Sequence, residues 1–417
     1  VWLMSFVCEA TGPSARIVLR QAMTHATPGV PSAAIAADGR LVAVVSMARL
    51  LPADTNSLSD IYVLDRTSGT LTLETVSPNG TVSNGTSDNP RLSAGGRYLV
   101  FHSVGTNLTG LPDRNDVQDV FLRDRQAGIT RRLSLGLAGQ EANANSAVPA
   151  IDDEGAFVAF VSSATNLAPE DDANGAGDDV YLVRVATGVI SRVSLDNQGR
   201  QFDFAHSPSL DANGRLVAFT ARERATPPAQ RGGSKTLRDV AVYVRDVTSG
   251  VTTCISCARD DARDGLPAFA PDLSADGRSV AFAVQSEPQR SDVAIHDRSS
   301  SVTTVITRKA NARSAGPRVS ADGRAVVFES WASDLLCERR CSVEELDENV
   351  LPDIYLFDVA TKRFSRLSGS DRVWWAPSVA PAIDAHGRTV VFSSRQAFGP
   401  EDVTVDFDLY VCAPACE

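Results

Sequence analysis

Apolar and polar residues alternate in short runs along the whole chain, and each run follows the same kind of turn. In six places a proline is followed six residues later by a glycine, and a strand pattern such as Tyr98–Phe101 begins just beyond; in the first copy Ala33 stands in the place of the proline. Alternation with period two indicates pleated strands, and glycine supplies the positive φ that a tight turn needs. The repeated glycines are Gly39, Gly96, Gly155, Gly214, Gly277, Gly323 and Gly387.

The repeat is long enough to hold one four-stranded unit. Its glycines lie 46 to 64 residues apart, with a mean of 58, and an arginine follows the glycine in six of the seven copies. Each unit contains a further aromatic strand, such as Val120–Leu122 or Ile354–Leu356, which usually ends at an aspartate. Four strands with one variable loop are typical of a propeller blade. The pattern predicts an all-β fold, a seven-bladed β-propeller of four-stranded blades.

The N-terminal segment matches the fourth strand that the seventh unit lacks. The seventh unit stops at Val411 and Cys412, just after its aromatic strand, and residues 15–20 resemble the fourth strand of the other units. We therefore expect the N-terminal strand to close the ring, which would leave no open sheet edge. On this interpretation residues 1–417 form a single propeller domain.

Two stretches carry a resemblance to a known family. The run Leu273–Arg278 (Leu-Ser-Ala-Asp-Gly-Arg) and the run Asp119–Asp124 (Asp-Val-Phe-Leu-Arg-Asp) resemble the TolB-like, WD-repeat-like propellers of bacteria, and the resemblance spans nearly the whole chain. It implies the propeller fold. It leaves function open, because that family includes interaction scaffolds, propellers attached to peptidases and a few lyases.

Charge and hydropathy exclude two classes of partner. The 417 residues carry a formal net charge of −11 at a pI near 5, so we expect no nucleic-acid partner, because phosphate binding needs a concentrated basic face. No run approaches the roughly 20 apolar residues of a spanning helix, so we expect no membrane span.

Six of the seven cysteines form close pairs, and Cys8 is the odd one. Local disulfides in an oxidising compartment are favoured over zinc, because two pairs from different blades would have to converge on one metal ion. This favours a periplasmic or extracellular protein. Cys8 would then either bridge to the last pair and latch the ring or remain a buried thiol. The pairs are Cys254/Cys257, Cys337/Cys341 and Cys412/Cys416.

A polar loop with one spacing recurs between the two central strands of four units. Side-chain oxygens that alternate along a turning loop are the ligands that calcium prefers, so the loops are candidate structural calcium sites. The alternative is that Asp and Asn serve only as turn residues, and the fourth and fifth units lack the motif altogether. The four copies are Asp54/Asn56/Asp60, Asp113/Asn115/Asp119, Asp172/Asn174/Asp178 and Asp347/Asn349/Asp353, with a degenerate Asp402/Asp406/Asp408 in the seventh unit.

The sequence contains no recognisable catalytic set. It has no Gly-x-Ser-x-Gly elbow, and its five histidines are scattered without metal-ligand spacing. We expect His102 and His206 to lie near the central channel. The adjacent Trp374 and Trp375, on the loop that enters the seventh unit, are candidates for a binding surface or for packing beneath that loop.

Three interpretations of function remain. The leading one is a non-enzymatic, exported propeller that binds a protein or carbohydrate partner at its rim of loops, with calcium as a candidate stabilising ion. The alternative is a polysaccharide-active enzyme, a lyase or glycosidase, whose residues gather in the central channel from many blades without leaving a local motif. The third is a purely structural envelope protein, which predicts a filled channel and no conspicuous pocket.

Overall fold

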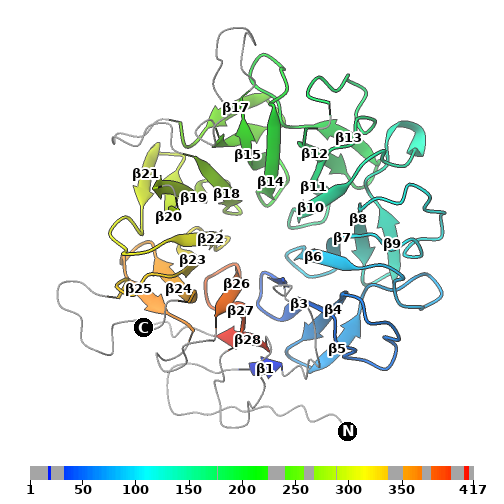
Figure 1. The fold of residues 1–417 in the computed structure, drawn as a ribbon, viewed down its shortest axis with the longest axis horizontal. Helices are drawn as coiled ribbons and strands as arrows, with labels where there is room; N and C mark the ends of the chain where they lie inside the picture. The colour runs from blue at the N-terminus through cyan, green and yellow to red at the C-terminus, as the bar shows by residue number, and fades with distance from the viewer. Residues whose placement is uncertain are drawn as a thin grey trace.

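The computed structural model describes residues 17–19, 32–175, 177–223, 240–257, 267–287, 289–336, 351–368, 377–395 and 408–412. These residues form seven four-stranded antiparallel sheets arranged as blades around a central axis (Figure 1). The first strand of each blade lies nearest the centre and the fourth lies outermost (Figure 1). The predicted seven-bladed propeller of four-stranded blades is confirmed.

The blades follow one another along the chain. Blade one contains β2 (Ala33–Ile35), β3 (Leu41–Ser46), β4 (Asp60–Asp65) and β5 (Thr70–Leu73); blade two contains β6 (Ser87–Leu92), β7 (Tyr98–Ser103), β8 (Asp119–Asp124) and β9 (Ile129–Arg132). Blade three contains β10 (Ser146–Ile151), β11 (Phe157–Ser162), β12 (Asp179–Arg184) and β13 (Val189–Arg192); blade four contains β14 (Phe204–Leu210), β15 (Leu216–Arg222), β16 (Val240–Asp246) and β17 (Val251–Cys254).

Blade five contains β18 (Ala268–Leu273), β19 (Ser279–Glu287), β20 (Arg290–Asp297) and β21 (Val302–Val305); blade six contains β22 (Ser314–Val319), β23 (Ala325–Ser330), β24 (Asp353–Asp358) and β25 (Phe364–Arg366). Blade seven contains β26 (Ser378–Ile383), β27 (Val390–Ser394), β28 (Asp408–Cys412) and β1 (Ile17–Leu19). One 3-10 turn, η1 (Leu137–Gly139), follows β9. No helix in the described part of the chain has the length and hydropathy to span a bilayer.

Seven hydrophobic clusters fill the spaces between neighbouring blades. Each cluster draws buried side chains from two adjacent sheets, and the cluster between blades seven and one includes Tyr62 and Val391. The strands supply these side chains because both faces of a blade are covered, which explains their nearly continuous apolar runs. The core is therefore a closed circle of interfaces between blades.

The turns between the first two strands of the blades form a second circle. At each turn a backbone N–H donates to a carbonyl in the turn of the next blade, at 2.9 to 3.1 Å, and the last bond returns to the first blade. The bonds run from Ala37 to Ala94, from Ala94 to Asp153, from Asp153 to Ala212, from Ala212 to Ala275, from Ala275 to Ala321, from Asp322 to Ala385 and from Ala385 to Ala37.

Two physical constraints favour glycine at the repeated position in these turns. Every one of the seven has φ between 67° and 73°, which L side chains rarely adopt. A Cβ on Gly214 would also lie 2.6 Å from the Cβ of Phe157, which belongs to the preceding blade. The residue two positions after one glycine thus packs against the next glycine around the ring.

The repeated proline follows a bulge in the innermost strand. The residue just before it has a positive φ in blades two to seven, including Val148 (φ 51°) and Ser207 (φ 54°), and the pairing with the second strand shifts register there. Proline suits the position after the bulge because it needs no ladder donor. The bulge recurs in six blades, so its strain belongs to the architecture and does not mark one special site.

The N-terminal strand β1 pairs antiparallel with β28, with Ile17 opposite Val411. The circle of turn hydrogen bonds and the hydrophobic cluster between blades seven and one join the ring without β1. The predicted closing role of the N-terminal strand therefore stays a prediction.

Candidate functional site

Each blade has two unlike ends. The tight turns occupy one end of the blades, whereas the polar loops between second and third strands and the connections between blades occupy the other. We call this second end the long-loop face. Both candidate sites, the polar loops and a cavity beside the channel, lie there.

An aspartate at the start of the third strand fixes the polar loops. In five blades a Ser or Thr hydroxyl fifteen residues later donates to this buried carboxylate, and the same hydroxyl accepts the next backbone N–H of the strand. The pairs are Thr75 to Asp60, Ser134 to Asp119, Ser194 to Asp179, Thr307 to Asp292 and Ser368 to Asp353.

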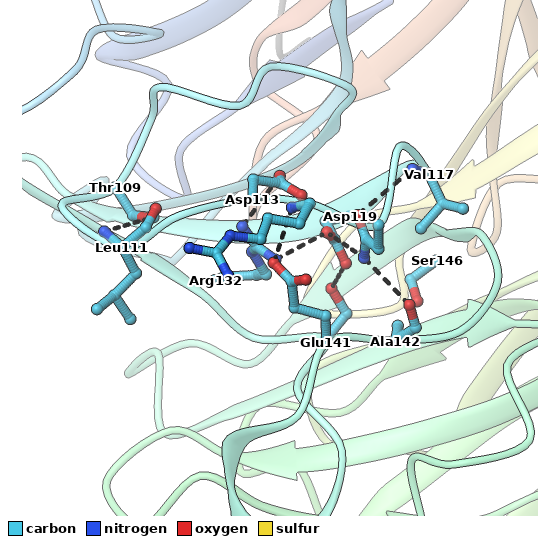
Figure 2. Close-up of polar contacts among 12 residues, drawn as sticks. Thr109, Leu111, Asp113, Val117, Asp119, Arg132, Glu141, Ala142 and Ser146 are labelled. Carbon is cyan, nitrogen blue, oxygen red and sulfur yellow. Dashed lines mark hydrogen bonds and ion pairs between the residues drawn. The ribbon is translucent and has the colours of Figure 1, made fainter.

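In blade two a guanidinium lies among the loop's acidic side chains (Figure 2). Arg132, at the end of β9, lies 3.0 Å from Asp113, 3.4 Å from Asp119 and 3.0 Å from Glu141. The side chains of Arg132, Asp113 and Asp119 are at most 4% exposed. Burial raises the pKa of both aspartates, and Arg132 opposes that rise. Arg132 thus places a positive charge where the sequence predicts a calcium ion.

Blade three repeats this arrangement with Arg192. Its Nε lies 3.2 Å from Asp179, its Nη2 lies 3.7 Å from Asp172, and Nη2 also donates to the Tyr181 hydroxyl at 3.0 Å. Burial raises the pKa of Asp179 to about 6. The residue equivalent to Asp119 is Asp179, which corrects the sequence alignment on Asp178. Asp178 lines the cavity described below instead.

Blade one lacks the arginine, because Leu73 occupies its register position opposite Tyr62. Asp54 accepts the Tyr62 hydroxyl at 2.5 Å, and Asp60 accepts Thr75 at 2.6 Å. The Oδ2 of Asp60 is buried and accepts no hydrogen bond. Burial raises the pKa of Asp60 to about 6, although the hydrogen bond from Thr75 opposes it. Of the three loops whose Asp and Asn residues are all described, this one has two buried carboxylates that pair with no described arginine or lysine.

The remaining copies are partly described. Asp347 and Asn349 lie outside the described residues, as do Asp402 and Asp406, whereas Asp353 begins β24 and is buried. Arg366 stands opposite Tyr355, the register position that Arg132 and Arg192 occupy in their blades.

The asparagines of the loops bind backbone. The Nδ2 of Asn56, Asn115 and Asn174 donates to the carbonyls of Ser83, Ala142 and Phe202 respectively, each in the connection to the following blade. The Oδ1 of Asn56 accepts the Leu58 amide at 2.7 Å. These asparagines therefore tie each loop to its neighbour.

The arginines were missed because they lie in a different strand from the loop. A signal was present: position thirteen after the third-strand aspartate is Arg132, Arg192 and Arg366 in three blades but Leu73 in the first. Its meaning needs the strand register, which sets that position opposite an aromatic residue of the third strand.

A cavity of about 650 Å³ opens on the long-loop face beside the channel. It lies mainly between β14 of blade four and β18 of blade five, and Asp178 of blade three and Arg313, just before β22 of blade six, extend its lining. Aromatic rings and polar groups meet in it: Phe204, His206, Phe269, Gln285, Arg290 and Arg313 all line it.

The two histidines expected near the channel have different roles. His102 accepts the Val148 amide at its Nδ1, at 3.3 Å, so it joins blades two and three. His206 lines the cavity, where its ring stacks on Phe204 at 5.9 Å and its Nδ1 lies 3.1 Å from the Ser207 hydroxyl. Burial lowers the pKa of His206, and Asp178 acts in the opposite direction. Trp374 and Trp375 lie outside the described residues.

Three of the seven cysteines lie in the described residues. Cys254 and Cys257 form a disulfide at the end of β17, as expected for a close pair, and Cys412 is buried in β28. The other four lie outside the described residues. Within the described ranges, no three His, Cys, Asp or Glu side chains are placed to share a metal ion.

Comparison with known proteins shows the fold. No protein-family model and no curated protein matches the sequence. Oligogalacturonate lyase from Vibrio parahaemolyticus is similar in structure, with a TM-score of 0.54 at 11% identity over 92% of this chain and 88% of the lyase. The β-propeller domain of the trilobed protease from Pyrococcus furiosus has a TM-score of 0.54 at 12% identity, over 87% and 90%.

The match to TolB from Acinetobacter baumannii spans 86% of this chain and 77% of the TolB chain, at 13% identity and a TM-score of 0.41. The neighbours with the higher score share the propeller architecture and differ in activity, so they show the fold alone.

We expect Arg132→Leu to lower the free energy of unfolding by about 3 to 5 kcal/mol, because it leaves Asp113 and Asp119 buried without a counter-charge. Urea unfolding measures the change. The control is Arg131→Leu at the exposed neighbour, which should change the free energy by less than about 0.5 kcal/mol. Adding Asp119→Asn to Arg132→Leu should restore part of the loss. Equal midpoints for the two arginine variants would contradict the account.

We expect the unfolding free energy of the Asp60→Asn variant, relative to that of wild type, to increase as pH rises. The folded protein holds a proton on Asp60 between pH 4 and 6 that the unfolded chain releases, so wild-type stability falls across that window. The variant has no such proton, and its unfolding free energy relative to wild type should rise by roughly 2 to 3 kcal/mol from pH 4 to pH 7. Urea titrations at each pH measure it, with the exposed Glu154→Gln as control. A difference independent of pH would refute the assignment.

Proposed function

We propose that this chain is a non-enzymatic propeller that binds a ligand, or an exposed group of a protein or carbohydrate partner, in the cavity on the long-loop face. The cavity carries this proposal. Its volume of about 650 Å³ and its mixture of aromatic rings with a few polar groups are typical of ligand sites. Four blades contribute to it, and the ring of turn hydrogen bonds beneath holds those blades in place. A conspicuous pocket disfavours a purely structural role.

We further propose that the protein works in the periplasm or outside the cell. The Cys254–Cys257 disulfide supports this, because disulfides persist in oxidising compartments and are rare in the cytosol. The resemblance of the repeats to TolB-like propellers agrees with a scaffold role in such a compartment.

The alternative, a polysaccharide-active enzyme, is favoured by one observation. Burial lowers the pKa of His206 and so favours its neutral imidazole, which is the form that accepts a proton. A glycosidase, however, uses two carboxyl groups, and Asp178 is the single carboxylate among the described lining residues. Binding is therefore the better-supported function.

Calcium is retained as a proposal for the first loop alone. Blades two and three place an arginine among their aspartates, whereas no described arginine forms an ion pair with Asp54 or Asp60, and the Oδ2 of Asp60 accepts no hydrogen bond from the described residues. Calcium takes six to eight oxygen ligands, so water would complete a site with two carboxylates. The ion would stabilise the loop and take no part in binding the ligand.

We expect a library of small organic ligands and oligosaccharides to yield binders that depend on the cavity. Ligand-observed NMR should detect them with wild type, and Phe204→Ala and Phe269→Ala should weaken them at least about tenfold by removing the aromatic walls. The control, Val189→Ala at the exposed first residue of β13, which does not line the cavity, should bind as wild type does. Recovered ligands should be chemically unchanged.

Conversion of a recovered oligosaccharide that His206→Ala abolishes would favour the enzyme instead. Binders that ignore both phenylalanine variants, or no binders at all, would contradict the proposed function.

We expect calcium to stabilise the protein through the first loop. At about 10 mM calcium, a site with a dissociation constant of about 0.1 to 1 mM adds roughly 1 to 3 kcal/mol to the unfolding free energy. Calorimetry in calcium and in excess chelator measures the shift. Asp54→Asn should abolish it and Asp113→Asn should keep it. No shift in wild type, or an unchanged shift in Asp54→Asn, would remove calcium from the account.

A further inference from the structure

One arginine of the cavity is fixed in place by stacking. The guanidinium carbon of Arg313 lies 3.7 Å from the centre of the Trp331 ring. The backbone carbonyl of Arg313 also accepts the Trp331 amide at 3.0 Å, so the two residues are joined where blade six begins. A stacked guanidinium keeps its N–H groups at its edge, free to donate in the plane of the group.

Those donors have no acceptor among the described residues. Within the described part of the chain, the guanidinium of Arg313 makes no hydrogen bond and no ion pair. The acidic side chain that interacts with it electrostatically is Glu329, whose Oε1 already accepts the Ala380 amide at 2.7 Å. Arg313 lines the cavity, so an acceptor for its donors can come from a ligand.

A second arginine adds positive charge to the same cavity. Arg290 lies 3.9 Å from Asp292 and 4.0 Å from Glu287, which are long ion pairs, and its buried Nε donates no hydrogen bond. Asp178 is the one acidic residue among the described lining residues. The lining residues thus include two arginines and one aspartate, in a chain whose net charge is −11.

Flat rings form the apolar part of the wall. Phe204 and His206 are stacked at 5.9 Å with an angle of 11° between their planes, and the half-buried Phe269 lines the same cavity from blade five. Aromatic walls of this kind receive a planar or ring-shaped group by stacking.

We propose that the cavity selects ligands that carry a carboxylate next to a flat apolar ring, with Arg313 as the carboxylate contact and the Phe204–His206 pair as the ring contact. Guanidinium and carboxylate match in bidentate geometry, and a carboxylate carries a single negative charge for the single Arg313 guanidinium. This inference rests on the proposed function and names its ligand class. The carboxylate has two possible sources, a free aromatic acid or the C-terminal residue of a peptide that ends in an aromatic side chain.

The test compares a matched acid and amide. We expect 3-phenylpropionate to bind wild type at least about tenfold more tightly than 3-phenylpropionamide, because a hydrogen bond between two charged groups is stronger than one to a neutral amide. Acetate, which lacks the ring, should bind more weakly than either. Isothermal titration calorimetry at pH 7 gives the three dissociation constants.

The variant Arg313→Gln should reduce the preference for the acid to within about twofold while leaving the amide's affinity unchanged. The matched control is Arg184→Gln, because Arg184 also stacks on a ring, 5.0 Å from the centre of Phe157, and does not line the cavity. It should keep the full preference. Thermal unfolding of both variants checks that they fold.

Equal affinity of wild type for acid and amide, no binding of either, or a preference that survives Arg313→Gln would overturn the inference. The proposed function would still stand if neutral ligands from the library bind and depend on Phe204. A short peptide ending in phenylalanine, with a free and an amidated C-terminus, distinguishes the two sources: a free-end peptide that binds more tightly than 3-phenylpropionate indicates a protein C-terminus, and a weaker one indicates a free acid. Both of these results support the carboxylate site.

Discussion

Seven backbone hydrogen bonds join the turns at one end of the blades into a circle, from Ala37 through five intermediate turns to Ala385 and back to Ala37. The circle requires a backbone shape that places an N–H and a carbonyl of each turn toward opposite neighbours. Glycine provides that shape and leaves room for the side chain of the blade before it. The glycine therefore repeats in the sequence because every blade makes the same contact with its neighbour.

The circle also divides the molecule into two unlike ends. At the turn end the tight turns are short, and their backbone groups pair between neighbouring blades. At the long-loop face each blade is free to differ, as loops on a rigid scaffold usually are. The first three polar loops illustrate this freedom: two are neutralised by Arg132 and Arg192, whereas the first has Leu73 at the same register position. The cavity arises at this face, where blades three to six contribute unlike residues.

The fold could be predicted from the sequence because its cause is local and repeated. Gly214, for example, lies in a tight turn whose glycine recurs at the same position in every unit of the repeat. The sequence shows the polar loops, but it does not assign Arg132 to them, because Arg132 follows Asp119 by thirteen residues and meets it only through the pairing of β8 with β9. In the third loop a single extra residue shifted the expected aspartate from Asp179 to Asp178. The cavity had no local signal at all, since Asp178, His206 and Arg313 come from three blades.

Hydrogen–deuterium exchange of the turn amides tests the account most directly. If the circle of hydrogen bonds holds the ring together, the amides of Ala37, Ala94, Asp153, Ala212, Ala275, Asp322 and Ala385 exchange slowly and at similar rates, because none can open without parting two blades. Rapid exchange at the turns of one blade, with the others protected, would show that the blades open independently and would contradict a closed ring.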